Sequence, residues 1–366
     1  MSSDKINVVV VGGGAIGCSI AYYLAQAGAR VSLLERGPLC GESSAAAAGL
    51  LSVSNKDGLM LTLVQESLRL MAELSEDHGI DFELAARGNL VLLRTEEELR
   101  RQRAFVEKQR QSGMDIHFLD PKAALEMEPA LSPDILGASY SPMDAAVNPY
   151  ALTLAFGAAA RRLGVTIRTG VEVTALKSEG GRVSTAVTSE GEVAGDILVV
   201  AAGAWTPMLT RTVGLDLPIE PSRGQILVTQ PQGPMIRTIV RDAGHMYVNP
   251  TARGNYVIGS MTERVGFDKR LTRARLRDYV AEAANLVPAV AGMRIARAWT
   301  GLRPLTPDSQ PILGKVEGYD GLILAAGHSR TGICFSAITG KMLANLITTG
   351  DAGYPMDAFS IERLAA

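Results

Sequence analysis

A valine run followed by closely spaced glycines constrains this chain more than any other feature: residues 8–24 read VVVVGGGAIGCSIAYYL. The valines predict a buried parallel strand, and the apolar residues after the glycines recur at helical spacing from about Ala15. Gly12 permits a tight turn, Gly14 lets the backbone approach a pyrophosphate, and Gly17 allows the helix to pack closely on the strand. The free N–H groups at the start of this helix would then point at the phosphates of a dinucleotide.

A carboxylate at the end of the next predicted strand supports a dinucleotide site. Residues 30–36 read RVSLLER, and Glu35 stands roughly 20 residues beyond the glycines, where a carboxylate accepts hydrogen bonds from ribose hydroxyls. The charge of Glu35 would repel the 2′-phosphate of NADP. Because NAD and FAD both carry this ribose, Glu35 does not separate those two cofactors.

Two later stretches favour FAD over NAD. Residues 41–52 read GESSAAAAGLLS, and such small side chains would let the backbone lie against a bulky ring system. The same residues also fit a helix start with either serine as N-cap, and both interpretations can hold at once. Residues 321–347 predict another strand, a glycine turn and a last helix whose start is bracketed by Gly327 and Gly332. The N-terminus of that helix would face the N1–C2=O edge of a flavin, which becomes negative on reduction.

Composition narrows the partners of the chain. The 366 residues carry a formal net charge of −2 with no Lys/Arg run, so nucleic acid is not expected to bind. No run of about 18 apolar residues occurs, so no membrane-spanning helix is expected. Cys18, Cys40 and Cys334 form no CxxC pair, and the four histidines form no metal-spaced cluster. This cysteine usage is typical of a reducing cytoplasm, and no metal is expected.

Six segments together resemble one known family. VVVVGGGAIG, SSAAAAGLL, GDILVVAAGAWT, PSRGQILV, WTGLRPLTPDSQPILG and AAGHSRTGI are similar to segments of the D-amino-acid-oxidase superfamily of FAD enzymes, in the same order and over nearly the entire chain. Within that superfamily the chain is most similar to glycine oxidases of the thiamine-pathway type. PSRGQILVTQ and GSMTERVGFD also resemble flavin subunits of the hydrogen cyanide synthase and hydroxyproline dehydrogenase type.

The resemblance implies an α/β fold with a discontinuous layout. An FAD-binding Rossmann-type (glutathione-reductase-like) domain would comprise residues 1–80, 145–220 and 295–366. An interleaved α+β substrate domain, built on an antiparallel sheet, would comprise residues 81–144 and 221–294. The sequence agrees coarsely with this layout. TEEELRRQRAFVEKQRQSG predicts a solvated helix with Thr95 and Glu98 as a capping box, and HMYVNP and NYVIGSM predict strands around a turn at Gly254.

The resemblance also implies which residues contact FAD. Relatives with a covalently bound flavin carry a cysteine close to the segment GLRPLTPD, which has none here, and Cys334 is expected inside the last helix, so FAD is expected to be noncovalent. The implied contacts are Gly12, Gly14, Ala15, Ile16 and Gly17 at the pyrophosphate, Glu35, Arg36 and Val173 at the ribose and adenine, and Ser43, Ser44, Ala48, Gly49, Leu50, Gly203, His328, Ser329, Arg330, Thr331, Gly332, Ile333 and Cys334 along the phosphates and flavin.

The implied chemistry needs placement of the substrate more than proton transfer. A hydride would move from the substrate Cα to flavin N5 while a neutral amine becomes an imine, so no side chain is expected as catalytic acid or base. A guanidinium binds a carboxylate through two parallel hydrogen bonds, as a lysine cannot. Arg303, flanked by Gly301 and Pro304, is the expected clamp, and Tyr247 would offer its hydroxyl to the same carboxylate. Arg330 would close the pocket or shield the charge of the reduced flavin.

Each of these substrate residues also has a plainer interpretation. Arg303 on its own fits a surface ion pair, and Tyr247 fits a half-buried tyrosine of a sheet. His328 is expected to supply a backbone contact beside FAD rather than to transfer protons. Trp299 and Met261 would either line the pocket or pack in the core.

Three functions from different classes remain open on the sequence. The leading one is an FAD-dependent amino-acid oxidase acting on glycine, sarcosine or small D-amino acids, with oxygen as acceptor and hydrogen peroxide as product. The second is a dehydrogenase subunit that passes electrons to a partner protein or a quinone. The third is a nucleotide-sensing module without turnover, which would need no carboxylate clamp. The sequence leaves open whether the chain forms a homo-oligomer.

Overall fold

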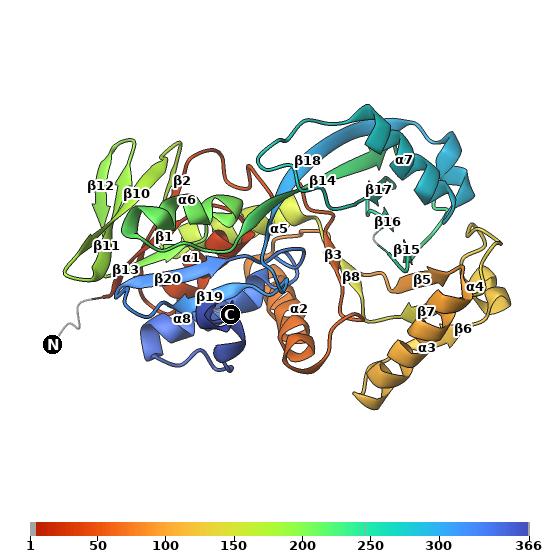
Figure 1. The fold of residues 1–366 in the computed structure, drawn as a ribbon, viewed down its shortest axis with the longest axis horizontal. Helices are drawn as coiled ribbons and strands as arrows, with labels where there is room; N and C mark the ends of the chain where they lie inside the picture. The colour runs from red at the N-terminus through yellow and green to blue at the C-terminus, as the bar shows by residue number, and fades with distance from the viewer. Residues whose placement is uncertain (1–4, 245, 365–366) are drawn as a thin grey trace.

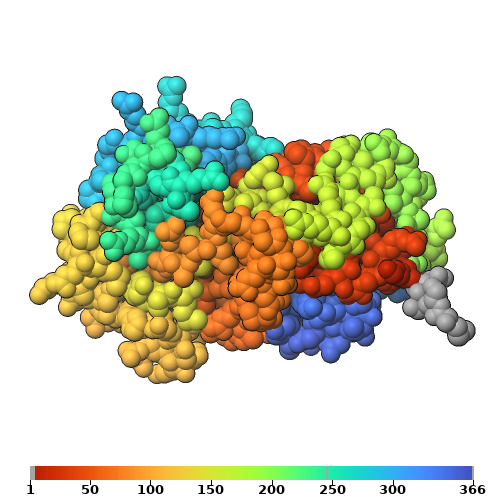
Figure 2. All heavy atoms as spheres, turned by 180° about the vertical axis from the view of Figure 1, so that it is seen from behind, coloured from red at the N-terminus to blue at the C-terminus, as the bar shows by residue number. Residues whose placement is uncertain are grey.

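The computed structural model describes residues 5–244 and 246–364 and has two lobes joined by long strands (Figure 1). One lobe is built on a six-stranded sheet and the other on an eight-stranded sheet. Figure 2 shows the molecule from behind, where the orange chain that includes α2 (Gly58–His78) lies at the middle of the face.

The six-stranded sheet has the strand order β19-β20-β13-β1-β2-β9, and all neighbours are parallel except β19 and β20. The carboxyl ends of β1, β13 and β20 therefore lie side by side, so the turns that follow them meet at one edge, where such sheets bind ligands. The strands are β1 (Asn7–Val11), β2 (Arg30–Glu35), β9 (Thr166–Thr169), β13 (Ile197–Val200), β19 (Ile312–Lys315) and β20 (Leu322–Ala326).

Both faces of this sheet are covered, which explains the unbroken valine run of β1. Val8 and Val10 pack into the cluster formed with the helices, whereas Val9 and Val11 pack into a second cluster on the opposite face. The first face carries α1 (Ala15–Gln26), α5 (Pro149–Arg162), α8 (Ser336–Thr349) and α2. The second face carries β10 (Val173–Glu179), β11 (Arg182–Thr188), β12 (Gly191–Ala194) and α6 (Thr206–Thr210).

The eight-stranded sheet has the order β18-β14-β17-β16-β15-β5-β7-β6 and is antiparallel except between β5 and β15. Its strands are β5 (Asn89–Leu93), β6 (His117–Leu119), β7 (Gly137–Ser141), β14 (Glu220–Thr229), β15 (Ile239–Asp242), β16 (Tyr247–Pro250), β17 (Tyr256–Gly259) and β18 (Ile295–Leu305). The same lobe contains α3 (Glu96–Gln111), α4 (Pro121–Met127) and α7 (Arg273–Ala284), and a small sheet of β3 (Leu50–Leu51), β8 (Ala145–Ala146) and β4 (Ala85–Ala86) connects the two lobes.

The predicted fold class and several local predictions are confirmed. The first strand, the glycine turn and the helix from Ala15 form as expected, and β2 ends at Glu35. Helix α3 begins with the predicted capping box, in which Thr95 and Glu98 each satisfy the backbone N–H of the other. Strands β16 and β17 pair antiparallel around Gly254, which has a φ of 77°.

Two predicted helix starts are wrong. No helix begins within residues 41–49, which form turns and irregular chain before β3, and Ser44 caps the N-terminus of α1 instead of a helix of its own. The last helix begins at Ser336 rather than beside Gly332, because residues 328–335 form turns of their own, with the Phe335 N–H bonded to the Thr331 carbonyl. Cys334 therefore lies before α8 and not inside it.

The predicted division into FAD and substrate segments stays a prediction. The strands of the six-stranded sheet all come from the segments predicted for the FAD domain, but β18 belongs to the eight-stranded sheet although it follows residue 294. In the described part of the chain, no helix is long and apolar enough to cross a membrane.

Candidate active site

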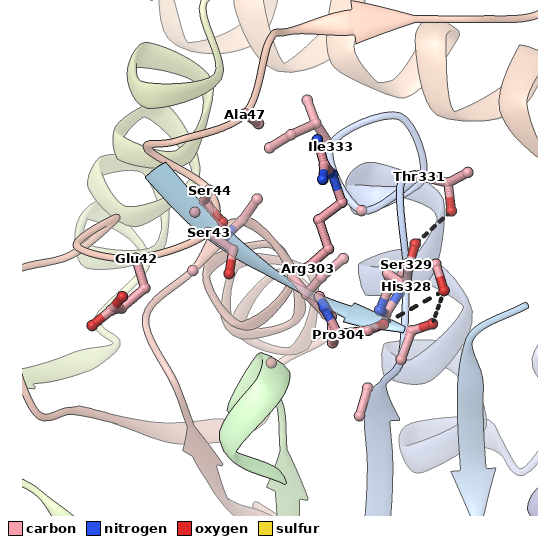
Figure 3. Close-up of a pocket in the computed structure, with 18 of the residues that line it drawn as sticks. Glu42, Ser43, Ser44, Ala47, Arg303, Pro304, His328, Ser329, Thr331 and Ile333 are labelled. Carbon is pink, nitrogen blue, oxygen red and sulfur yellow. Dashed lines mark hydrogen bonds between the residues drawn. The ribbon is translucent and has the colours of Figure 1, made fainter. Parts of the chain in front are cut away.

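A cavity of about 770 Å³ opens at the edge where β1, β13 and β20 end and extends to the eight-stranded sheet. This volume is within the range of about 300–1,000 Å³ that is usual for small-molecule sites. Every residue predicted to contact FAD or substrate lines the cavity, except Gly17. Figure 3 shows Arg303 between the segment of Ser43 and Ser44 on one side and the loop of His328 and Thr331 on the other.

The glycine turn has the geometry that a pyrophosphate requires. Gly12 has a φ of 111°, and a Cβ on it would lie 2.5 Å from the Ala201 carbonyl oxygen. A Cβ on Gly17 would overlap the carbonyl oxygen of Gly12, so Gly17 permits close packing without lining the cavity. The Ala15 N–H donates to Ser44 Oγ at 3.0 Å, which places this hydroxyl at the helix N-terminus, where anions bind.

Glu35 holds the turn and keeps acceptor capacity for a ribose. Its Oε2 accepts from the Gly13 N–H at 2.6 Å, and its Oε1 accepts from the Gly37 N–H at 2.8 Å. A carboxylate has about four lone-pair sites, so two remain for hydroxyl donors. The site therefore fits the ribose of a dinucleotide.

The end of the cavity beyond Glu35 is lined by an aromatic residue that the sequence did not indicate. The Arg36 guanidinium lies 4.1 Å from the ring centroid of Trp205 and donates to Glu42 at 2.9 Å. Trp205 also contacts Phe267, with ring centroids 5.4 Å apart. Flat groups of this kind suit the adenine that the sequence places near Arg36 and Val173.

The loop after β20 presents backbone donors to the cavity. The N–H groups of Gly332 and Ile333 line it and have no acceptor among the described residues, as a binding site for a flavin C2=O edge requires. The His328 imidazole lies 3.2 Å from Thr339 Oγ1, and burial lowers its pKa to about 3, so His328 is neutral. Burial also raises the pKa of the Cys334 thiol to about 12.

Arg303 lies on β18 with its guanidinium inside the cavity. Its Nη1 donates to the Met261 carbonyl at 3.3 Å and its Nη2 donates to the Ser260 hydroxyl. A Cβ on Gly224 would overlap this guanidinium, so the neighbouring strand leaves the space that Arg303 occupies. Burial lowers the pKa of Arg303 from its ordinary value.

Tyr247 and Arg330 lie beside this clamp. A Cβ on Gly259 would lie 2.8 Å from the Tyr247 hydroxyl, so a second glycine leaves room for that group. Burial raises the pKa of Tyr247 although Arg303 opposes the shift, so the hydroxyl stays protonated and can donate. Arg330 Nη2 donates to the Ser260 carbonyl at 3.0 Å, and burial followed by repulsion from Arg303 lowers the pKa of Arg330 to about 10.

The structure adds further residues to the lining and leaves two candidates outside it. Ser260, Arg241 and Lys56 line the cavity, and the sequence analysis named none of them. Arg241 was detectable in part, because it precedes Tyr247 on a neighbouring strand. Trp299 lines a separate cavity of about 260 Å³, and Met261, whose carbonyl accepts from Arg303, lines neither cavity.

Nothing among the described residues resembles a metal centre: no group of three or more His, Cys, Asp or Glu side chains is placed to hold an ion. The cavity instead combines backbone donors, glycines and cations. These features fit the pyrophosphate, ribose and isoalloxazine of FAD at successive points along its length.

Comparison with known proteins agrees with this fit. The glycine oxidase of Geobacillus kaustophilus is 33% identical over 373 residues, covering 99% of this chain and 98% of that protein. A crystal structure of glycine oxidase from that organism has a TM-score of 0.92 at 32% identity and covers 98% of this chain and 99% of that one. The hydrogen cyanide synthase subunit HcnC of Pseudomonas protegens is 31% identical, covering 96% of this chain and 94% of that protein.

A further solved structure and a family model extend the comparison. The L-proline dehydrogenase of P. horikoshii has a TM-score of 0.93 at 28% identity, covering 99% of this chain and 98% of that one. The family model described as FAD dependent oxidoreductase (DAO) matches residues 7–346. The chain therefore belongs to the DAO family of FAD-dependent oxidoreductases, and FAD is its cofactor.

Proposed function

We propose that the protein catalyses the oxidative deamination of glycine, sarcosine or a small D-amino acid. The observation that carries this proposal is the Arg303 guanidinium, which lies inside the cavity without an ion-pair partner among the described residues. An unpaired buried guanidinium is costly unless a ligand supplies the anion, and the carboxylate of an amino acid is the simplest such ligand. The 33% identity to a glycine oxidase over nearly the full length of both chains supports the same substrate class.

In this proposal the chain's residues bind and orient the substrate. Arg303 holds the substrate carboxylate through two hydrogen bonds, Tyr247 donates its hydroxyl to the same group, and Arg330 closes the cavity over it. Bound FAD supplies the acceptor for the hydride that leaves the substrate Cα. His328 takes no proton, because it is neutral, buried and directed at Thr339.

FAD would be bound without a covalent bond, by the contact residues predicted from the sequence and by the segments predicted for the FAD domain. Of the three cysteines, Cys334 lines the cavity, and its high pKa keeps it a thiol rather than the nucleophilic thiolate. The free, buried cysteines are in keeping with a cytoplasmic protein.

Oxygen is the proposed electron acceptor. The substrate loses a hydride and a proton and becomes an imino acid, which water converts to a 2-oxo acid and ammonia, or to a 2-oxo acid and methylamine when the substrate is sarcosine. Oxygen then takes the two electrons and two protons and becomes hydrogen peroxide. A dehydrogenase that passes electrons to a partner or a quinone is the second candidate, favoured by the 31% identity to HcnC and by the likeness to an L-proline dehydrogenase.

One assay tests both candidates. The purified yellow protein is mixed anaerobically with glycine, sarcosine, D-alanine, D-proline or hydroxyproline, and the visible absorbance of the flavin is followed before and after air is admitted. The oxidase is supported if a substrate bleaches the flavin and air restores it at a catalytic rate with one peroxide per turnover. Bleaching that only a dye or quinone reverses at that rate supports the dehydrogenase. The proposal is overturned if no amino acid bleaches the flavin.

A further inference from the structure

Two cations at the substrate end of the cavity play no part in the proposed clamp. Arg241, on β15, is the antiparallel partner of Tyr247 on β16, so the two side chains are cross-strand neighbours on one face of the sheet. Lys56 comes from the segment just before α2. Both residues are half-buried and line the same cavity as Arg303.

Neither cation forms an ion pair in the described part of the chain, although the buried Asp144 carboxylate acts on both at longer range. The only hydrogen bond of the Arg241 guanidinium found there is from Nη1 to Ser52 Oγ, at 3.5 Å. Its Nε is buried without an acceptor. Lys56 forms no ion pair with any described carboxylate. Buried polar groups are nearly always hydrogen-bonded, so the Arg241 Nε calls for a ligand that supplies an acceptor, and Lys56 adds a second cation beside it in the same cavity.

The carboxylates near these cations are already engaged. Asp57 lines the cavity but pairs with Lys108 at 2.6 Å. Asp144 is buried behind the lining, and its oxygens accept from the Val53 N–H at 3.0 Å and from the N–H and hydroxyl of Ser54 at 2.8 Å. At the substrate end, Lys56, Arg241 and Arg303 therefore line the cavity without an ion pair to any described carboxylate.

Repulsion among the cations agrees with this surplus of positive charge. Burial lowers the pKa of Lys56 and repulsion from Arg241 lowers it further, while Cys334 and Asp144 oppose the shift. Arg241 also contributes to the lowered pKa of Arg330, after burial and Arg303. A ligand with a single carboxylate bound by Arg303 would leave Arg241 and Lys56 without an ion pair.

We propose that the preferred substrate is an amino acid with a second anionic group, which Arg241 and Lys56 bind while Arg303 binds the α-carboxylate. The substrate class is an acidic D-amino acid, whose second carboxylate is on the side chain of Cα, or an N-carboxymethyl amino acid, whose second carboxylate is attached through the nitrogen. This inference rests on the proposed function and narrows it. Two separated carboxylate sites also fix the orientation of the substrate in the cavity.

The first test compares substrates on the FAD-loaded protein. Kinetics of flavin reduction are measured with glycine, D-aspartate, D-glutamate and iminodiacetate. A dicarboxylate is expected to have a kcat/KM at least about tenfold above that of glycine, as a charged hydrogen-bond pair contributes. The comparison of D-aspartate with iminodiacetate shows whether the preferred substrate carries its second carboxylate on the side chain of Cα or on the nitrogen. If glycine is oxidised and every dicarboxylate has a lower kcat/KM than glycine, the inference is overturned and the proposed function stands.

The second test uses variants and inert ligands. Arg241→Gln and Lys56→Gln should each lower the dicarboxylate-to-glycine ratio, the first by about tenfold or more, and Arg241→Lys should retain part of the preference. Arg297→Gln, at an exposed position on β18, removes the same charge elsewhere and should leave the ratio unchanged.

Malonate should perturb the flavin spectrum at a lower concentration than acetate, and this difference should shrink in Arg241→Gln. The inference would be overturned if Arg241→Gln and Lys56→Gln both kept the dicarboxylate-to-glycine ratio and the malonate binding of the wild type. If no amino acid reduces the flavin but malonate still binds through Arg241, only the proposed function fails.

Discussion

The dinucleotide end and the substrate end of the cavity are built in different ways. At the dinucleotide end, the cavity is lined by backbone groups and glycines in short stretches, such as residues 12 and 14–16 and residues 327–333. At the substrate end they come from long cationic side chains on β15 and β18 and from the segment before α2. The first end depends on local chain geometry, whereas the second depends on which strands lie next to one another. The two ends should therefore fail in different ways when single residues are changed.

The largest effect is expected from breaking the dinucleotide end alone. In Gly17→Val, the added atoms overlap the carbonyl of Gly12 and push α1 off β1, which is expected to destabilise the protein by about 3 kcal/mol or more and to abolish FAD binding. The flavin that stays with the protein through gel filtration and the melting temperature are measured. Gly292→Ala, where nothing lies near the added carbon, is the control. Full retention of FAD in Gly17→Val would show that the glycine turn still binds FAD when α1 moves away from β1.

The converse variant breaks the substrate end and leaves the cofactor bound. Removing one partner of a desolvated charge pair costs about 2–5 kcal/mol, so Arg303→Ala should lower kcat/KM by roughly 30-fold to several thousand-fold. Arg303→Lys should recover only part of this loss, because a lysine cannot bind a carboxylate through two parallel bonds. Steady-state kinetics and the bound flavin are measured together, with Arg297→Ala on the same strand as control. Near-normal kinetics in Arg303→Ala would reject the clamp.

A subtler change moves Arg303 without removing it. In Gly224→Ala the new Cβ overlaps the Arg303 guanidinium, which is the free end of a flexible side chain, so the guanidinium shifts while the fold persists. A misplacement of about 1 Å can cost about 100-fold in rate, and a loss of that order is expected in kcat/KM with an unchanged melting temperature. Gly233→Ala, with no atom near the added carbon, should behave as wild type. Equal activity in both variants would mean that the position of Arg303 is not limiting.

The same contrast explains what the sequence could predict. The glycine pattern, Glu35 and the loop at 328–334 were identified because their spacing along the chain determines their geometry. Arg241 was not identified, because its proximity to Tyr247 and Arg303 follows from the order β18-β14-β17-β16-β15 and from the parallel pairing of β15 with the distant β5. Lys56 was not identified either, because its segment before α2 reaches the same cavity only in the folded chain. The role of Ser44 was also misjudged in part, since it caps a helix that begins 29 residues earlier.

The smallest effect concerns the loop that joins the two ends, and it is a dependence of stability on pH. Burial lowers the pKa of His328 to about 3, so below about pH 6.5 the unfolded chain binds a proton that the folded protein does not. The contribution of neutral His328 to the free energy of unfolding is therefore fully present near pH 7 and falls as the pH is lowered toward 3.

Between pH 7 and pH 5 the loss from His328 should be about 2 kcal/mol at most, and His328→Gln should lack it. Urea unfolding of the wild type and the variant at both pH values measures the difference, in which the contributions of other groups cancel. Equal losses in the two proteins would mean that the folded protein protonates His328 and that its imidazole reaches water. The loop at residues 328–335 would then present the His328 side chain to solvent, in addition to its backbone N–H groups, and would resemble the substrate end in this respect.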